Sequence, residues 1–307
     1  MKTVTVHIPA TSANLGPGFD VLGVALGLTN EVRATADGTG KGKIGSLSIN
    51  IHGAGVDELP RNASNLLVQA MIRVCKKTKC WPASLKLELV NRIPLSRGLG
   101  SSSAAIVGGL AAANRLLGDP LSQDELLEMA VEMEGHPDNV TPALLGGFCV
   151  SGVFERKTRY WRIPAASDLK AVVAVPELPL PTKAARAVLP KQVSIKDAVF
   201  TASRVAFLLG ALVQKRYDGL GSAMEDVLHQ PYRKRLIPGL MDVIAAAKKA
   251  GAYGAALSGA GSCVVAFVPA GVVGKRVGAA MQNSFKKHGV VSQGLQLDLE
   301  NRGIRFK

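Results

Sequence analysis

Apolar and polar residues alternate in several short stretches of the first half of the chain, as they do in half-buried strands. The first stretch is residues 3–8, where polar side chains separate Val4, Val6 and Ile8. The same alternation predicts strands at residues 31–34, 47–51 and 85–90. After Asn65 the apolar residues follow a helical spacing instead, and they share one face: Leu66, Leu67, Ala70, Met71 and Val74.

Two more helices are expected in this half. Residues 106–113 are an unbroken run of small and apolar side chains, which is typical of a buried helix. Residues 122–125 (Ser-Gln-Asp-Glu) have the spacing of a capping box, so a helix should begin there and end near Glu134. Pro137 bars its continuation. Beyond it, a polar hairpin tip is expected at residues 155–159.

A second unit is predicted from about residue 165. Buried strands are expected at residues 171–175, 255–257, 263–268 and 295–299, and helices at 199–212, 237–249 and 272–287, with Pro238 in the first turn of the middle helix. This order suits an antiparallel sheet with helices on one face. We therefore expect an α+β protein of two units, residues 1–164 and 165–307.

Composition excludes some classes of protein. Of the 307 residues, 47% are hydrophobic and 20% charged, as in a globular protein with a real core. No charge-free apolar run of about 20 residues occurs, so no membrane span is expected. The four cysteines lack metal-ligand spacing and are interpreted as free thiols of a cytoplasmic protein.

The net charge of +14 fits either a nucleic acid or a polyanionic small substrate. The basic residues are dispersed along the chain, and only 5% of the residues are aromatic, which leaves few stacking platforms. No nucleic-acid or membrane partner is therefore expected.

The strongest chemical signal is the Gly/Ser-rich stretch Pro94–Ala105, which joins the strand at 85–90 to the helix at 106–113. Such a turn presents backbone N–H groups and hydroxyls to an anion at the positive end of a helix. It lacks the Lys of a Walker A loop, and Ser103 stands where a dinucleotide fingerprint has its third Gly. A helix-capping turn is the alternative interpretation.

Three other segments gather polar residues at turns. Asn14 and Asp20 flank Gly16-Pro17-Gly18, which is either a fixed bend at the edge of the core or a surface loop with an Asx turn. Residues 134–139 (Glu-Gly-His-Pro-Asp-Asn) are dense in ligand atoms and fit a metal site, a substrate site or a polar helix terminus. Residues 258–262 form a second Gly/Ser turn.

Taken together, the Asn14–Asp20 loop, Pro94–Ala105 and residues 257–261 resemble the three motifs of the galactokinase, homoserine kinase, mevalonate kinase and phosphomevalonate kinase (GHMP) superfamily, in order and spacing. Residues 9–20 and 134–139 are most similar to those of homoserine kinases. The resemblance covers essentially the whole chain. It implies an N-terminal ribosomal-S5-like domain, a C-terminal ferredoxin-like domain and a site between them. The implied reaction is transfer of the ATP γ-phosphoryl group to the hydroxyl of L-homoserine, in threonine biosynthesis.

The resemblance also implies roles for individual residues. Glu134 and the loop serines Ser101 and Ser102 would hold Mg²⁺, and Asp20, Glu134 and Ser101 would be the catalytic residues. ATP would be bound by Asn65, Pro94, Arg97, Gly98, Leu99, Gly100, Ser101, Ser102, Ser103, Gly259 and Gly261. Homoserine would be bound by Asn14, Asp20, His136, Asn139, Thr182, Arg186 and Arg233. A forked guanidinium group suits a carboxylate, and Asp20 suits an ammonium group.

Several alternatives remain open at this point. A kinase of another small alcohol, such as mevalonate or shikimate, and a non-catalytic metabolite sensor are rivals to the homoserine kinase hypothesis. Glu132 is a rival to Glu134 as the metal ligand, and no residue is required to be a general base. The loop carries three serines where the family often has two, and Ser262 stands where the third motif often has proline. The sequence does not give the oligomeric state, and a homodimer is one candidate.

Overall fold

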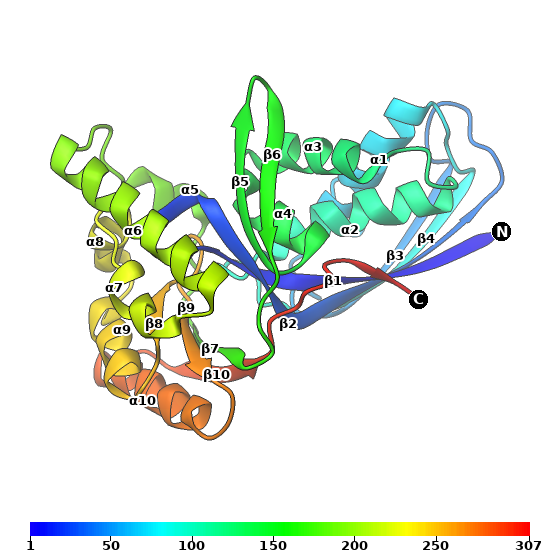
Figure 1. Ribbon diagram of the computed structural model, residues 1–307. Coiled ribbons are helices and arrows are strands. Elements are labelled where there is room, and N and C mark those ends of the chain that lie inside the picture. The colour runs from blue at the N-terminus through cyan, green and yellow to red at the C-terminus, as the bar shows by residue number, and fades with distance from the viewer.

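Two β-sheets organise the computed structural model, which describes all 307 residues (Figure 1). The first sheet has seven strands in the order β11-β1-β2-β4-β3, with β5 also paired to β2 and β6 to β5. Only the pairing of β3 with β4 is parallel. The strands are β1 (Lys2–Asn14), β2 (Gly18–Asp37), β3 (Ser46–Gly53), β4 (Ser84–Asn91), β5 (Phe148–Phe154), β6 (Lys157–Ile163) and β11 (Arg305–Phe306).

Four helices pack with this sheet: α1 (Leu66–Thr78), α2 (Ser101–Leu116), α3 (Gln123–Glu134) and α4 (Pro137–Leu145). Local signals set two of their starts, of which the capping box was expected from the sequence. The Asn65 side chain accepts a hydrogen bond from the Leu67 amide and caps α1. Ser122 and Glu125 form the complete capping box of α3. The small side chains of α2 let most of that helix lie buried, which anchors its N-terminus.

Two local features in this half were not expected from the sequence. The segment 9–20 is a tight hairpin and not a surface loop, since β1 stays paired with β2 as far as Asn14 and only the buried residues Leu15, Gly16 and Pro17 turn. Pairing with the next strand here overrides the turn-forming residue types. Pro137 does end α3, but it is also the first residue of α4, where its missing N–H costs nothing.

The second sheet is antiparallel and has the order β10-β7-β9-β8. Its strands are β7 (Leu169–Pro176), β8 (Gly254–Leu257), β9 (Val264–Pro269) and β10 (Ser292–Leu297). With α9 (Leu240–Lys249) and α10 (Val273–Lys287), this is the β-α-β-β-α-β arrangement of ferredoxin-like folds, so the expected α+β fold class is confirmed.

Alternate residues of β7 belong to different cores. Val172 and Ala174 pack with α9 and α10, whereas Ala171 and Val173 join the large core of the first unit. The two sheets are therefore held together by a shared apolar layer, which includes the contact of Phe148 with Phe267 at 5.6 Å between ring centroids. This layer fixes the relative position of the loops that each sheet contributes to the site.

The segment between β7 and α9 is helical: α5 (Thr182–Ala187), α6 (Ile195–Gln214), η1 (Tyr217–Gly219), α7 (Leu220–Ala223), α8 (Gln230–Arg233) and η2 (Lys234–Leu236). The expected start of α9 is wrong, since Pro238 lies outside the helix. Gly239 caps α9 in a left-handed conformation that proline cannot adopt, and the helix begins one residue later.

α6 is an unusual helix because its apolar side chains are mostly exposed. By length and composition alone it is apolar enough to cross a membrane, since its most apolar 18 residues have a mean hydropathy of 1.3. Only 11% of those residues are buried. Lys196 and Asp197 lie in its first turns, and Arg204 pairs with Glu225 at 3.0 Å. Phe207 is 73% exposed. The sequence indicated an apolar helix here but not that it would face outward.

The last residues of the chain return to the first sheet. β11 pairs with β1, and the carbonyl of Glu300 accepts a hydrogen bond from Gly147 at 2.7 Å. Both ends of the chain accordingly lie on the same side of the molecule (Figure 1). A division at residue 165 follows the two sheets and remains our proposal for the domain boundary, with residues 298–307 associated with the first domain.

Candidate active site

A cleft of 320 Å³ lies where the Gly/Ser-rich loop, the β1–β2 turn and the start of α4 meet segments of the second unit. Its volume suits a small ligand. The cleft brings together most of the residues singled out in the sequence: Asn14, Asp20, Asn65, Pro94, Arg97, Gly98, Leu99, Gly100, Ser101, Ser102, Glu134, His136, Asn139, Thr182, Arg186, Arg233 and Gly259. Ser103 and Gly261 do not line it.

The N-terminus of α2 opens into this cleft. Gly100 caps the helix in a left-handed conformation without a side-chain hydrogen bond, and no acidic residue occupies the first turn. The amides of Ser101, Ser102 and Ser103 have no backbone acceptor. Free amides at the positive end of a buried helix are a binding site for phosphate groups.

The Gly/Ser turn of the second unit holds this loop from behind. Ser258 donates a hydrogen bond to the Gly98 carbonyl at 2.7 Å, and a Cβ added at Gly98 would lie 2.0 Å from the Ser258 carbonyl oxygen. A Cβ at Gly100 would lie 2.0 Å from the hydroxyl of Thr11. Both glycines have a positive φ, so the loop depends on them for its shape and for its packing.

Glu134, at the end of α3, faces the first turn of α2. Its carboxylate accepts hydrogen bonds from Ser102 at 2.9 Å and from Ser103 at 3.0 Å, whereas Ser101 makes no contact with it. Glu132 points away and pairs with Arg73 on α1 at 3.1 Å. The geometry thus favours Glu134 over its rival. A carboxylate beside serine hydroxyls is a set of hard oxygen donors that suits Mg²⁺.

Asp20 and Arg186 form an ion pair across the two units. Two guanidinium nitrogens of Arg186 donate to the two carboxylate oxygens at 2.6 and 3.0 Å. The ring of Phe19 lies beneath both Arg186 and Arg233, at 5.4 and 5.3 Å from the guanidinium carbons. Charges of both signs therefore stand side by side at one end of the cleft.

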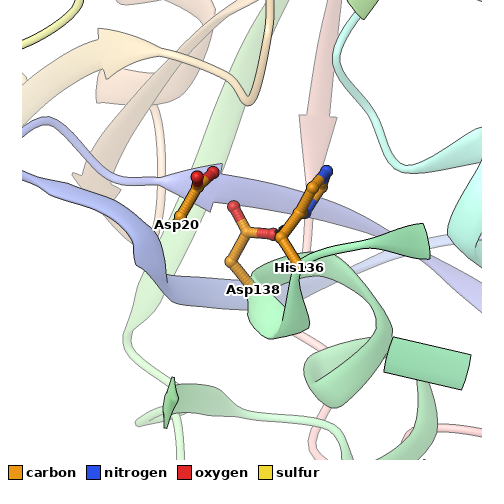
Figure 2. A group of neighbouring side chains, drawn as sticks. All are labelled: Asp20, His136 and Asp138. Atoms are coloured by element: carbon orange, nitrogen blue, oxygen red, sulfur yellow. Dashed lines mark hydrogen bonds and ion pairs between the residues drawn. The ribbon is translucent and has the colours of Figure 1, made fainter. Parts of the chain in front are cut away.

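His136 and Asp138 extend this charged end from the start of α4, and their side chains approach Asp20 (Figure 2). His136 Nδ1 lies 2.5 Å from an oxygen of Asp138, which is buried. Burial lowers the pKa of His136, but the hydrogen bond and charge of Asp138, with the charges of Glu134 and Asp20, outweigh it and raise the pKa. The three side chains are close enough to hold a metal ion. Arg186 already pairs with both carboxylate oxygens of Asp20, so this end of the cleft holds a connected set of charges of both signs.

Asp138 was not assigned a role from the sequence. It lies in the ligand-rich segment 134–139, but nothing in that segment shows which side chain turns inward. The start of a helix at Pro137 was the missing information, because it directs Asp138 and Asn139 toward the cleft. A proline followed by acidic and amide residues is a helix-start signal that was available in the sequence.

Arg233 is buried at the floor of this end, with 1% of its surface exposed. Its Nε donates to the Ala185 carbonyl at 3.1 Å and its Nη1 to the Gly259 carbonyl at 2.9 Å. Burial, with the nearby charge of Arg186, lowers its pKa to about 10, so the group stays charged at neutral pH. Nothing in the sequence around Arg233 shows that this side chain is buried.

Some predicted ligands use their polar groups within the protein. Asn14 donates to the Gly259 carbonyl at 2.9 Å and accepts from the Asp20 amide at 3.0 Å. Asn139 accepts from Thr11 at 2.7 Å, and Arg97 donates to the Pro176 carbonyl at 2.9 Å. Asn65 caps α1 and donates to the Pro60 carbonyl at 2.8 Å. These residues shape the walls of the cleft whatever they contact in a complex.

The amino-acid sequence matches two family models, "GHMP kinases N terminal domain" over residues 65–147 and "GHMP kinases C terminal" over residues 208–287. Both describe the class of small-molecule kinases to which the fold and the phosphate-type loop point. A homoserine kinase of Carboxydothermus hydrogenoformans is 47% identical over 300 residues, which cover 98% of this chain and 95% of that protein. A homoserine kinase of Microchaete diplosiphon is 43% identical over 303 residues, covering 99% and 97%.

The same relationship appears among solved structures. The crystal structure of a homoserine kinase from Cytophaga hutchinsonii has a TM-score of 0.89 and 31% identity, covering 100% of this chain and 98% of that one. The chain therefore belongs to the homoserine kinase family, within the GHMP kinases.

Proposed function

We propose that this kinase transfers the γ-phosphoryl group of ATP to the side-chain hydroxyl of L-homoserine, which yields O-phospho-L-homoserine for threonine biosynthesis. The observation that carries the proposal is the paired charge at one end of the cleft: Asp20 and Asp138 beside Arg186 and Arg233, next to the amides of α2. An amino acid brings one ammonium and one carboxylate group, and this end offers a partner for each. Mevalonate and shikimate have no ammonium group for the acidic side chains.

Each element of the site contributes a separate part of the reaction. The free amides of α2 and the loop glycines would hold the triphosphate, and the two arginines would hold the homoserine carboxylate. Asp20, with Asp138 and His136 beside it, would hold the ammonium group. This arrangement orients the hydroxyl toward the phosphoryl group, and positioning with charge neutralisation is what phosphoryl transfer requires most.

Glu134 is the residue that would hold Mg²⁺, which neutralises charge on the phosphate oxygens when it is bound. Among the three serines, Ser102 both lines the cleft and touches Glu134, so we assign it as the hydroxyl ligand. Ser103 is buried and would hold the carboxylate in place. Ser101 lines the cleft without touching Glu134 and would contact phosphate instead.

We further propose that the protein is a cytoplasmic homodimer without nucleic-acid or membrane partners. The exposed apolar side chains of α6 support dimerisation, since contiguous apolar surface of this kind commonly marks an interaction site. The cysteines are all free, which fits a reducing compartment.

The deciding experiment measures ADP release from Mg·ATP with homoserine, mevalonate, shikimate, serine and threonine as parallel acceptors. We expect homoserine to give by far the highest kcat/KM. Equal or better turnover of mevalonate or shikimate would refute the proposed substrate. ATP binding without turnover of any acceptor would favour a metabolite sensor.

A further inference from the structure

We propose that His229 is a positioning residue for homoserine binding: it holds the guanidinium group of Arg233 in the orientation that receives the substrate carboxylate. This inference rests on the proposed role of Arg233 as a carboxylate ligand. His229 does not line the cleft, and no motif in the sequence singled it out. Its side chain is completely buried behind the site.

The hydrogen bonds of His229 define the state of its ring. Arg233 Nη1 lies 3.2 Å from His229 Nδ1, and His229 Nε2 lies 2.8 Å from the carbonyl oxygen of Gly16. A guanidinium group can only donate, so Nδ1 must accept. The single ring proton is then on Nε2, which donates to Gly16. His229 thus acts as a neutral ring with one acceptor and one donor.

The groups that face the ring agree with this state. Asp226 lies 3.4 Å from Nε2, but its oxygens already accept hydrogen bonds from the amides of Leu228, His229 and Gln230. Burial, chiefly, and the charge of Arg233 lower the pKa of His229 against the opposing charges of Asp226 and Asp20. Asp226 therefore fixes the backbone of the turn, and the turn aims the ring.

The position of the ring decides how Arg233 is presented. With Nε on Ala185 and Nη1 shared between Gly259 and His229, only Nη2 has no partner within the protein. Phe19 contacts both side chains, at 5.4 Å from the His229 ring centroid and 5.3 Å from the guanidinium carbon of Arg233. Gly16 and Phe19 belong to the same hairpin as Asp20. His229 therefore sets the direction of the carboxylate ligand relative to the proposed ammonium ligand.

Three substitutions separate the two hydrogen bonds. His229→Asn keeps an acceptor near the Nδ1 position, His229→Gln keeps a donor near the Nε2 position, and His229→Phe keeps only a ring against Phe19. We expect His229→Gln and His229→Phe to raise the homoserine KM roughly 5–10-fold, because one charged hydrogen bond to the guanidinium is lost. His229→Asn should stay within about twofold, and the ATP KM should not change in any of them. Equal KM changes for both substrates, or a larger change for Asn than for Gln, would overturn the proposal.

A double-mutant cycle with Arg233→Lys separates this inference from the role of Arg233 itself. If both hold, Arg233→Lys raises the homoserine KM and adding His229→Phe raises it little further. An unchanged KM in Arg233→Lys would refute the carboxylate role, and with it the basis of the inference. Fully multiplicative effects would show that His229 acts independently of Arg233 and would overturn only the positioning role.

A measurement on the unmutated protein covers the case in which the variants fail to fold. The chain has five histidines, so ¹⁵N labelling of histidine side chains gives few signals. We expect one ring in the Nε2–H form that does not titrate between pH 8 and 6. Spectra in which every histidine ring titrates in this range, or in which the ring that does not titrate carries its proton on Nδ1, would overturn the proposal.

Discussion

The substitution Gly98→Ala tests whether the second unit sets the shape of the phosphate-binding loop. Gly98 has a φ of 78°, in the left-handed region that costs a non-glycine residue about 1–2 kcal/mol. Its added Cβ would also lie 2.0 Å from the Ser258 carbonyl oxygen and 2.9 Å from the Gly261 nitrogen. These neighbours are backbone atoms, so the two loops must move apart. Overpacking of this kind adds about 1–3 kcal/mol.

Gly118 provides a matched control. It has a φ of 89°, and an added Cβ there would meet nothing within 4 Å. Gly118→Ala therefore carries only the backbone cost of about 1–2 kcal/mol, whereas Gly98→Ala carries that cost and the contact, about 2–5 kcal/mol in total. The difference between the two variants isolates the contact between the units.

Thermal unfolding and steady-state kinetics measure the two consequences. We expect Gly98→Ala to have a lower Tm than Gly118→Ala and to raise the ATP KM, because moving the loop displaces the amides that face the phosphates. Gly118→Ala should keep the kinetics of the unchanged protein. Equal Tm losses in the two variants, or an unchanged ATP KM in Gly98→Ala, would refute the reasoning.

Three further predictions concern the metal, the pH and the assembly. Glu134→Gln should lower kcat roughly 10²-fold and raise the Mg²⁺ concentration needed for activity. The side chain of Glu132 is 62% exposed, so Glu132→Gln should change kcat less than about twofold. Similar losses of kcat in the two variants would contradict the assignment of Glu134. Because the pKa of His229 is lowered by burial, the stabilising contribution of this residue is complete above about pH 6.5 and is lost as the pH falls. The Tm of the unmutated protein should therefore exceed that of His229→Asn by less at pH 5.5 than at pH 7.5. A constant difference in Tm would speak against a buried neutral ring. Phe207→Glu should convert a dimer into a monomer in light scattering, and a monomeric parent protein would disprove dimerisation.

Features of the site that depend on local sequence were predictable. The capping box at Ser122 and the glycines of the loop before α2 act within a few residues, so their spacing carries the information. Glu134 was found for the same reason, because the capped helix has to end before Pro137. The resemblance to GHMP kinases then supplied what no local pattern contains: that segments far apart in the chain share one cleft.

Features that depend on packing were not predictable. Three adjacent serines look alike in the sequence, and only the angle between α2 and α3 places Ser102 and Ser103, rather than Ser101, on Glu134. Arg233 resembles a surface arginine in its basic segment, but the turn capped by Asp226 carries it inward. The outward face of α6 has the composition of a buried helix, since composition does not state what covers a surface.

The return of the chain end to β1 has a consequence for biosynthesis. The ribosome makes β1 before the second sheet and β11 after it. The edge of β1 near Val6 and His7 stays open until Arg305 and Phe306 emerge, so the first sheet is completed only after the second sheet has been made. A chain cut off before Arg305 would carry an unfinished sheet with an exposed edge, which makes it a substrate for chaperones and proteases rather than a slightly shortened kinase.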